Sequence, residues 1–274
     1  MTGGAQGIAA IPYVAVIGVP LDENSSFLRG PALAPGRIRA ALHSGAMNLT
    51  TEDGVDLGAR DDWSDLGDLA PGSGEAAFTA ITERLASLYA AGARVLTLGG
   101  DHSITFPIIR GVAGSYPNLT ILHIDAHPDL YDEFEGSRRS HACPFARIME
   151  AKLTARLVQV GIRAMNPHQR QQADRFGVEV IAMRDYHPGL ALDLRGPVYV
   201  SLDLDALDPA FAPGVSHHEP GGLSVRDVLR LLASIEGTII GADIVEFNPI
   251  RDHAEMTAAV AAKFYKELVG YLLK

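Results

Sequence analysis

The sequence LTILHIDAHPD, residues 119–129, places a short apolar run directly before two carboxylates and an imidazole. Apolar runs without polar alternation are typical of strands that are buried on both faces of a parallel sheet. We expect a strand at each such run of the chain: Tyr13–Val19, Arg94–Leu98, Leu119–Asp125, Arg156–Ile162, Val178–Ile181, Val198–Asp203 and Ile239–Glu246. The sequence therefore predicts a sheet built largely from buried strands.

Helical patterns lie between these strands. Apolar residues recur at helical spacing within residues 78–88, and Gly92 follows as a stop signal. Ser224 is a typical N-cap of a further helix, and a last apolar stripe runs through residues 260–272. The alternation of strands and helices predicts an α/β fold, with a parallel sheet covered by helices on both faces. No linker-like change of composition divides residues 1–274, so we expect a single domain.

Two segments are too long to be simple connections in such a fold, Pro20–Pro35 and Asn48–Gly74. Long loops of compact α/β domains form either walls of an active site or solvated excursions. For Asn48–Gly74, which is rich in Asp and Gly, the second interpretation is at least as strong as the first.

The charge balance excludes some classes of partner. The chain of 274 residues has 23 Lys and Arg against 33 Asp and Glu, a formal net charge of −10. Nucleic acids and anionic membranes bind basic surfaces, so we expect neither as a partner. The single cysteine, the lack of a long apolar run and the lack of a signal-peptide pattern in residues 1–14 favour a soluble, cytoplasmic protein.

Three of the expected strands end in clusters of acidic and imidazole side chains. Side chains at positions i, i+2 and i+4 of extended backbone point the same way, so the members of one cluster converge. The carboxyl ends of parallel strands lie at one edge of the sheet, where ligands of such folds bind. The candidate ligands at this edge are His102, Asp125, His127, Asp129, Asp203 and Asp205.

This set of side chains predicts a metal centre. Four carboxylates gathered at one point repel one another strongly unless cations hold them. Four Asp and two His without a thiolate favour Mn²⁺, Mg²⁺, Fe²⁺, Ni²⁺ or Co²⁺ over a structural zinc ion. Because six side chains exceed the needs of one open metal site, we expect two ions that share carboxylates and hold a bridging water, at a separation of ~3.5–4 Å.

Each part of the pattern also has a purely structural interpretation. An Asp-X-Asp sequence after a strand often forms a turn or a helix N-cap, and a lone His102 is often only a hydrogen-bonded core residue. Asp208, which precedes Pro209, is expected to serve a turn and is left out of the ligand set. Three clusters at one edge are harder to explain in this way, because buried ionisable groups need compensation.

Four motifs in order resemble the ureohydrolases, the arginase–agmatinase family: GGDHSIT (99–105), DAHPD (125–129), SLDLDALDPAFAPG (201–214) and EPGGLS (219–224). The similarity extends over nearly the whole chain. Stretches such as GVSHHEPGGLSVRDVL, residues 214–229, are most similar to the plant-type arginases.

The resemblance implies a three-layer α/β/α sandwich with a mostly parallel, about eight-stranded sheet and two Mn²⁺ ions at its C-terminal edge. Matched motif by motif, one ion would be held by His102, Asp125, Asp129 and Asp203. The other would be held by Asp125, His127, Asp203 and Asp205, so that two carboxylates bridge.

The same resemblance implies catalytic roles for two further residues. His141 matches a loop histidine that acts as proton shuttle or general acid to the leaving amine, a role that suits an imidazole with an ordinary pKa of ~6.5. Glu246 matches the carboxylate that pairs with the substrate guanidinium, and a bidentate pair would hold the guanidino carbon over the bridging hydroxide. Cys143, two residues from His141, is interpreted as a packing residue, because the metal centre already supplies the nucleophile.

The implied reaction is hydrolysis of a guanidino group to urea and an amine. The plant-type similarity favours L-arginine, which gives L-ornithine, with agmatine, guanidinobutyrate and N-hydroxyarginine as alternatives. Ser137 and Arg138, with Arg139, lie in the loop that leads to His141 and are candidates for the substrate carboxylate, although solvated charges explain the arginines equally well. Asn166 stands where animal arginases carry an acidic residue for the α-ammonium, which weakens an animal-type recognition of arginine.

Two other classes of protein compete with this interpretation. A dinuclear phosphoesterase also uses Asp and His at strand ends, but its Asn-bearing metal motif and a phosphate cradle are not evident here. A catalytically inactive metal-binding homologue is the second, and the complete set of motif residues argues against it. The family commonly forms trimers and hexamers, so we expect a homo-oligomer.

Overall fold

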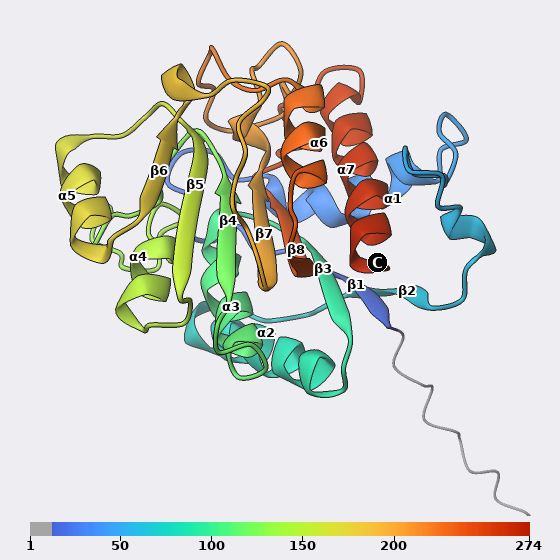
Figure 1. The fold of residues 1–274 in the computed structure, drawn as a ribbon, viewed down its shortest axis with the longest axis horizontal. Coiled ribbons are helices and arrows are strands. Elements are labelled where there is room, and N and C mark those ends of the chain that lie inside the picture. The colour runs from blue at the N-terminus through green and yellow to red at the C-terminus, as the bar shows by residue number, and fades with distance from the viewer. Residues whose placement is uncertain (1–12) are drawn as a thin grey trace, which may run out of the picture.

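An eight-stranded sheet forms the centre of the computed structural model, which describes residues 13–274 (Figure 1). The strand order is β2-β1-β3-β8-β7-β4-β5-β6, and every pairing between these strands is parallel. The predicted α/β fold with a parallel sheet of about eight strands is confirmed. Residues 1–12, which include most of the segment searched for a signal peptide, lie outside the described residues.

Seven strands lie where the apolar runs predict them, to within one residue at either end. They are β1 (Val14–Gly18), β3 (Arg94–Leu98), β4 (Thr120–Ile124), β5 (Arg156–Ile162), β6 (Glu179–Ala182), β7 (Pro197–Asp203) and β8 (Thr238–Val245). The agreement follows from burial: both faces of the central strands are covered, so their residues are apolar regardless of which face they point to.

The eighth strand, β2 (Trp63–Asp68), corrects the interpretation of Asn48–Gly74 as a loop without regular structure. Its sequence WSDLGD is polar and mostly exposed, because β2 is an edge strand that pairs only with β1. An edge strand needs no apolar run, so the hydrophobic pattern carries no signal for it.

Helices cover both faces of the sheet, as the alternating pattern predicts. On one face lie α1 (Ala34–Leu42), α6 (Val225–Ala233) and α7 (Met256–Leu272), of which α6 and α7 lie in front of the sheet in Figure 1. On the other lie α2 (Gly74–Ala90), α3 (Thr105–Ala113), α4 (Pro144–Glu150) and α5 (Pro167–Phe176). Short 3₁₀ helices complete the structure: η1 (Pro31–Leu33), η2 (Leu57–Ala59), η3 (His102–Ile104), η4 (Met183–Asp185) and η5 (Leu204–Ala206). None of the helices within residues 13–274 is long and apolar enough to cross a membrane.

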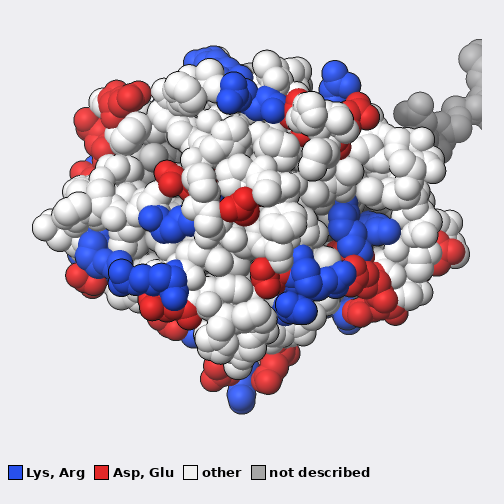
Figure 2. Space-filling view, turned by 90° about the horizontal axis from the view of Figure 1, so that it is seen from above, with Lys and Arg blue, Asp and Glu red and all other residues white. Residues whose placement is uncertain are grey.

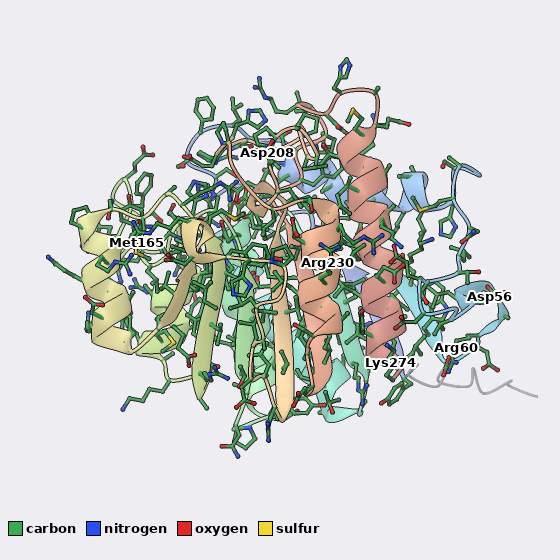
Figure 3. The ribbon with its side chains drawn as sticks, turned by 45° about the horizontal axis from the view of Figure 1, so that its top comes forward. Asp56, Arg60, Met165, Asp208, Arg230 and Lys274 are labelled. Carbon is green, nitrogen blue, oxygen red and sulfur yellow. The ribbon has the colours of Figure 1, made fainter. Side chains whose placement is uncertain are left out.

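The carboxyl ends of all eight strands meet at one edge of the sheet. Figure 3 labels Asp208, beyond the end of β7, among the loops at the top of the view, whereas Lys274 lies near the opposite edge. The face seen from above in Figure 2 carries basic and acidic side chains beside one another, and no continuous basic area covers this view of the described residues. Every cluster singled out in the sequence lies after a strand that ends at this edge.

The predicted N-cap at Ser224 offers a test of the helical pattern. The Ser224 side chain accepts a hydrogen bond from the backbone N–H of Asp227, whose carboxylate in turn accepts from the backbone N–H of Ser224. We expect Ser224→Ala to lower the free energy of unfolding by about 1 kcal/mol, measured by urea denaturation. Ser115→Ala, at an exposed serine, is the matched control and should stay within about 0.5 kcal/mol of the parent; equal effects would contradict the capping role.

Candidate metal centre and active-site cavity

The six predicted ligands converge in two neighbouring groups at the ends of β3, β4 and β7. In the first group, His102 Nδ1 lies 3.3 Å from Asp125 Oδ2, 3.1 Å from Asp129 Oδ2 and 3.1 Å from Asp203 Oδ2. In the second, His127 Nδ1 lies 3.1 Å from Asp205 Oδ2 and 3.5 Å from Asp125 Oδ1. Asp125 therefore offers one carboxylate oxygen to each group, as a bridging ligand would.

The backbone after each strand turns so that the acidic side chains face inward. Asp203 caps η5 by accepting a hydrogen bond of 2.7 Å from the backbone N–H of Asp205, and this leaves its other oxygen toward His102. Asp125 accepts in the same way from the backbone N–H of His127. Asp129 adopts a left-handed conformation with φ of 48°, which a non-glycine residue takes only at a cost of ~1–3 kcal/mol.

The hydrogen-bond partners of His102 assign Nε2 as a donor and direct Nδ1 toward the cluster. The hydroxyl of Ser201 donates to Asp243 over 2.7 Å, so the same oxygen accepts the proton of His102 Nε2, 3.0 Å away. Asp243 also accepts from the hydroxyls of Thr105 and Tyr199, which satisfies it as a carboxylate. Burial opposes a charge on His102, but Asp125, Asp129 and Asp203 around Nδ1 raise its pKa well above the ordinary value. Nδ1 is thus the atom that takes up a proton in the metal-free protein and that would offer its lone pair to a metal ion.

An imidazole nitrogen that faces three carboxylate oxygens needs either a proton or a metal cation between them. This geometry and the oxygen–imidazole donor set fit a divalent metal ion. Burial, together with the charges of Asp205 and Asp125, raises the pKa of Asp203 well above its ordinary value. Burial also raises the pKa of Asp205 to about 6, against the opposing effect of His127. Protons are thus drawn into the cluster wherever cations do not neutralise it.

One histidine of this region has no place in the predicted ligand set. His123 on β4 is fully buried, and its Nε2 lies 2.6 Å from Asp125 Oδ2. Alternation along a strand gives the missed signal, because residues i and i+2 share a face of the sheet. His102, His123 and Asp125 also form a group close enough to hold an ion, so the ring has to be assigned either as a ligand or as a supporting residue.

A cavity opens directly above the cluster. It is lined by four predicted ligands (His127, Asp129, Asp203 and Asp205), by the two predicted catalytic residues His141 and Glu246, and by Ser26, Tyr131, Phe134, Gln169 and His217. The segment Pro20–Pro35 contributes Ser26, so the interpretation of this segment as an active-site wall is the one that the structure supports.

His141 is held on both ring nitrogens. Its Nδ1 lies 2.8 Å from Glu246 Oε1, and its Nε2 lies 2.8 Å from the hydroxyl of Ser26. Burial alone would lower the pKa of His141, but the charge and hydrogen bond of Glu246, with Asp101 and Asp129, raise it to about 9. The imidazolium form of the ring is therefore favoured at neutral pH in the metal-free protein.

Glu246 lines the cavity, and one of its two carboxylate oxygens has no hydrogen-bond partner within residues 13–274. Its Oε1 accepts hydrogen bonds from His141 and from the backbone N–H of His102, while Oε2 is buried without a hydrogen-bond partner among the described residues. Burial would raise the pKa of Glu246, but the facing imidazolium and these hydrogen bonds hold it below its ordinary value. A buried carboxylate oxygen without a partner in a cavity wall suits a cationic ligand.

The residues predicted for the far end of the substrate lie outside the cavity wall. Arg138 donates to Asp132 over 2.6 Å and to Glu150 over 2.8 Å, and Ser137 accepts from the backbone N–H of Arg139. Arg138 and Arg139, which pairs with Glu75, thus form ion pairs of the solvated kind that competed with the predicted two-arginine clamp. Asn166 lies one layer behind the wall.

Asn166 orients two residues of the wall. Its Oδ1 accepts from the backbone N–H of Gln169, and its Nδ2 donates to the Tyr131 hydroxyl over 2.6 Å. The Tyr131 oxygen accepts, so its own proton is free to point to another acceptor. Gln169 Oε1 accepts a hydrogen bond from the backbone N–H of Asn166. Gln169 Nε2 donates to no group in the part of the chain that the structure describes.

Three further residues complete the description. His217, in the loop before α6, has its ring centroid 5.2 Å from that of His141, and burial lowers its pKa. Its only sequence signal is its place in the GVSHHEPGG stretch. Cys143 is buried, and burial raises the pKa of its thiol to about 12, which agrees with a packing role. Asp208 accepts from the backbone N–H groups of Ala210 and Gly221, which confirms its expected turn.

Comparison with known proteins decides the family. A model described as the arginase family matches residues 12–270. The chain belongs to the arginase family. It is 45% identical over 293 residues to arginase 2, chloroplastic/mitochondrial, of Arabidopsis thaliana, a match that covers 100% of this chain and 83% of that protein.

Other family members are similar in structure or in sequence. The solved arginase from Medicago truncatula matches with a TM-score of 0.90 and 42% identity, over 96% of this chain and 88% of that chain. The N(1)-aminopropylagmatine ureohydrolase of Thermus thermophilus is 39% identical over 260 residues, which cover 90% of this chain and 86% of that protein. The resemblance stated from the motifs is confirmed, and the chain is a ureohydrolase by family.

The His141–Glu246 pair gives a prediction for the metal-free protein. We expect the imidazole of His141 to titrate near pH 9, and Glu246→Gln to lower this pKa toward the ordinary ~6.5, because the largest charge that opposes burial is removed while Asp101 and Asp129 remain. The contribution of the pair to stability is fully present below pH ~6.5 and is lost as the pH rises through about 9. NMR of the ring carbon measures the pKa, with His141→Asn to assign the signal. An unchanged pKa in Glu246→Gln would contradict the pairing.

Proposed function

We propose that this protein is a binuclear metal hydrolase that cleaves the guanidino group of L-arginine to L-ornithine and urea. The observation that carries the proposal is Glu246 Oε2, a buried carboxylate oxygen without a partner in a cavity wall directly beside the two ligand groups. A planar cationic guanidinium supplies the donors that this oxygen lacks. The curated plant relatives named as arginases, similar over the whole chain, support arginine as the substrate.

The metal centre is proposed as two Mn²⁺ ions. His102, Asp125, Asp129 and Asp203 would hold one ion, and Asp125, His127, Asp203 and Asp205 would hold the other. Fe²⁺, Co²⁺ and Ni²⁺ suit the same donors. When bound, such a pair supplies a water activated for attack and positive charge that stabilises the developing anion.

The chain's own residues account for binding and proton transfer. Glu246 Oε2 accepts from the guanidinium and fixes the position of its central carbon above the ligand groups. His141 holds a proton on an imidazolium whose pKa is raised to about 9, and it donates this proton to the amine as that group leaves. Ser26, bonded to His141 Nε2, keeps the ring in its place.

Recognition of the amino-acid end is proposed to use neutral donors. No Lys or Arg is among the described residues that line the cavity, so the α-carboxylate would be received by the Tyr131 hydroxyl and the Gln169 amide, both oriented by Asn166. Ser137 and Arg138 have no such role in this proposal. Because no Lys or Arg of the described residues lines the cavity to pair with the carboxylate, agmatine stays the principal alternative, ahead of guanidinobutyrate and N-hydroxyarginine.

Three broader properties belong to the proposal. We infer that the whole chain acts as one ureohydrolase domain and that it assembles into a trimer or hexamer. A cytoplasmic location is the third, although the plant relatives are named for mitochondria and chloroplasts.

A substrate panel tests the reaction. We expect the Mn²⁺-loaded protein to release urea from L-arginine with a kcat/KM at least tenfold above that for agmatine, guanidinobutyrate or N-hydroxyarginine. Phosphoesters assayed for released phosphate serve as the control for the phosphoesterase class. Urea from none of the guanidines would refute the proposal and favour an inactive homologue, and a preference for agmatine would overturn the choice of arginine.

Removal of a ligand tests the metal centre. Asp203→Ala is expected to lower the bound Mn²⁺ from two ions per chain to one or none and to reduce kcat by at least a thousandfold, because Asp203 contacts the first group and stands beside the second. Elemental analysis of the purified protein measures the metal. Asp185→Ala, at an exposed aspartate, is the control and should retain both metal and activity. Full activity of Asp203→Ala would show that the ligands are wrongly assigned.

A further inference from the structure

The inference concerns two fully buried side chains behind the metal centre, His123 on β4 and Gln159 on β5. Neither lines the cavity, and neither belongs to the predicted ligands. The register of the parallel β4–β5 pair sets them side by side, because His123 is the partner of Gln159 in the ladder. Buried polar groups of this kind persist only where hydrogen bonds compensate them.

The backbone carbonyl of Pro128 fixes the orientation of the Gln159 amide. Gln159 Nε2 lies 2.7 Å from the Pro128 oxygen, which can only accept, so the amide nitrogen and not the amide oxygen faces it. The second proton of the same nitrogen points to His123 Nδ1, 3.0 Å away. Gln159 Oε1 is buried without a partner among the described residues, so these two donor contacts alone hold the amide.

The amide in turn fixes the tautomer of His123. Because Nδ1 accepts from Gln159, the ring proton resides on Nε2, and Nε2 donates to Asp125 Oδ2 over 2.6 Å. Phe145 stacks on the ring with a centroid distance of 3.8 Å, which fixes its plane. With one nitrogen accepting and the other donating, His123 has no lone pair left for a metal ion.

We propose that Gln159 and His123 form a positioning relay that orients Asp125, the carboxylate shared by the two ligand groups. The relay runs from the Pro128 carbonyl through the Gln159 amide and the His123 ring to Asp125 Oδ2. Hydrogen bonds from outside the ligand set hold ligating carboxylates in place, and losing one typically weakens metal binding 10–100-fold. This inference rests on the proposed metal centre. It assigns His123 as a supporting residue and not as a ligand, although His123, His102 and Asp125 lie close enough together to hold an ion.

Isosteric and conservative variants test the relay. Gln159→Glu keeps the shape of the side chain but replaces the donor by an acceptor, which draws the His123 proton to Nδ1 and away from Asp125. His123→Leu removes the donor, whereas His123→Gln retains an N–H near the position of Nε2. Gln172→Glu is the matched control, since Gln172 is also a buried glutamine but lies on α5 and contacts no ligand.

Mn²⁺ titration with detection of free Mn²⁺ by EPR gives the readout, together with the melting temperature of each metal-free protein to verify folding. The parent is expected to bind two ions per chain. We expect Gln159→Glu and His123→Leu to bind Mn²⁺ 10–100-fold more weakly but still to reach two ions at saturation, with His123→Gln and Gln172→Glu within threefold of the parent. If His123→Leu fails to fold, the comparison of Mn²⁺ affinity between Gln159→Glu and Gln172→Glu tests the relay.

The possible contrary results separate the relay from the proposed function. Affinities of Gln159→Glu and His123→Leu within threefold of the parent would overturn the relay alone. Loss of one ion per chain at saturating Mn²⁺ in His123→Leu would also overturn it, because His123 would then be a ligand. A parent that binds no Mn²⁺ would overturn the proposed metal centre and with it this inference.

Discussion

The repulsion among four buried carboxylates is the constraint on which the rest of the structure depends. Asp125, Asp129, Asp203 and Asp205 are all less than a tenth exposed and lie around two imidazoles at one edge of the sheet. Burial and mutual repulsion raise the pKa of Asp203 and Asp205, so the cluster takes up positive charge as protons or as metal ions. A fold that gathers these groups is stable only if something else holds each of them in position.

The parallel sheet supplies that support. Because β3, β8, β7 and β4 are neighbours, their carboxyl ends bring His102, Glu246, Asp203 and Asp125 together without a long connection. Each acid is then anchored through groups of the same edge: Asp203 and Asp125 accept from backbone N–H groups two residues on, and Glu246 accepts from the backbone of His102. Asp129 and Glu246 adopt left-handed conformations, with φ of 48° and 63°. Such conformations are strained for residues other than glycine, so the surrounding structure holds these two acids in position against local backbone strain.

The sequence predicts those parts of the site that lie within one strand end, and it fails for parts that depend on contact between distant segments. The position of DAHPD and DLD directly after strands predicts that Asp125, His127 and Asp205 lie near one another. The alternation of extended backbone is not the reason, because the chain turns after β4 and Asp205 lies in η5. Other loops and strands bring Ser26 and His217 into contact with His141, and Gln159 into contact with His123. The hydrophobic pattern of the sequence does not predict these contacts. Arg138 shows the opposite failure, because a charge near the right histidine finds nearer partners in Asp132 and Glu150. The edge strand β2 is not predicted, because it buries too few residues to show an apolar pattern.

In the proposed reaction, the two oxygens of Glu246 would let one carboxylate serve both the proton donor and a cationic substrate. Oε1 is already committed to His141 and to the backbone of His102, so a guanidinium at Oε2 does not have to displace the imidazolium. A cation at Oε2 would share the negative charge that raises the pKa of His141, and it would thereby lower this pKa. In the proposed reaction the imidazolium would then be a stronger acid when the leaving amine needs a proton, so that one side chain would couple cation binding to proton transfer.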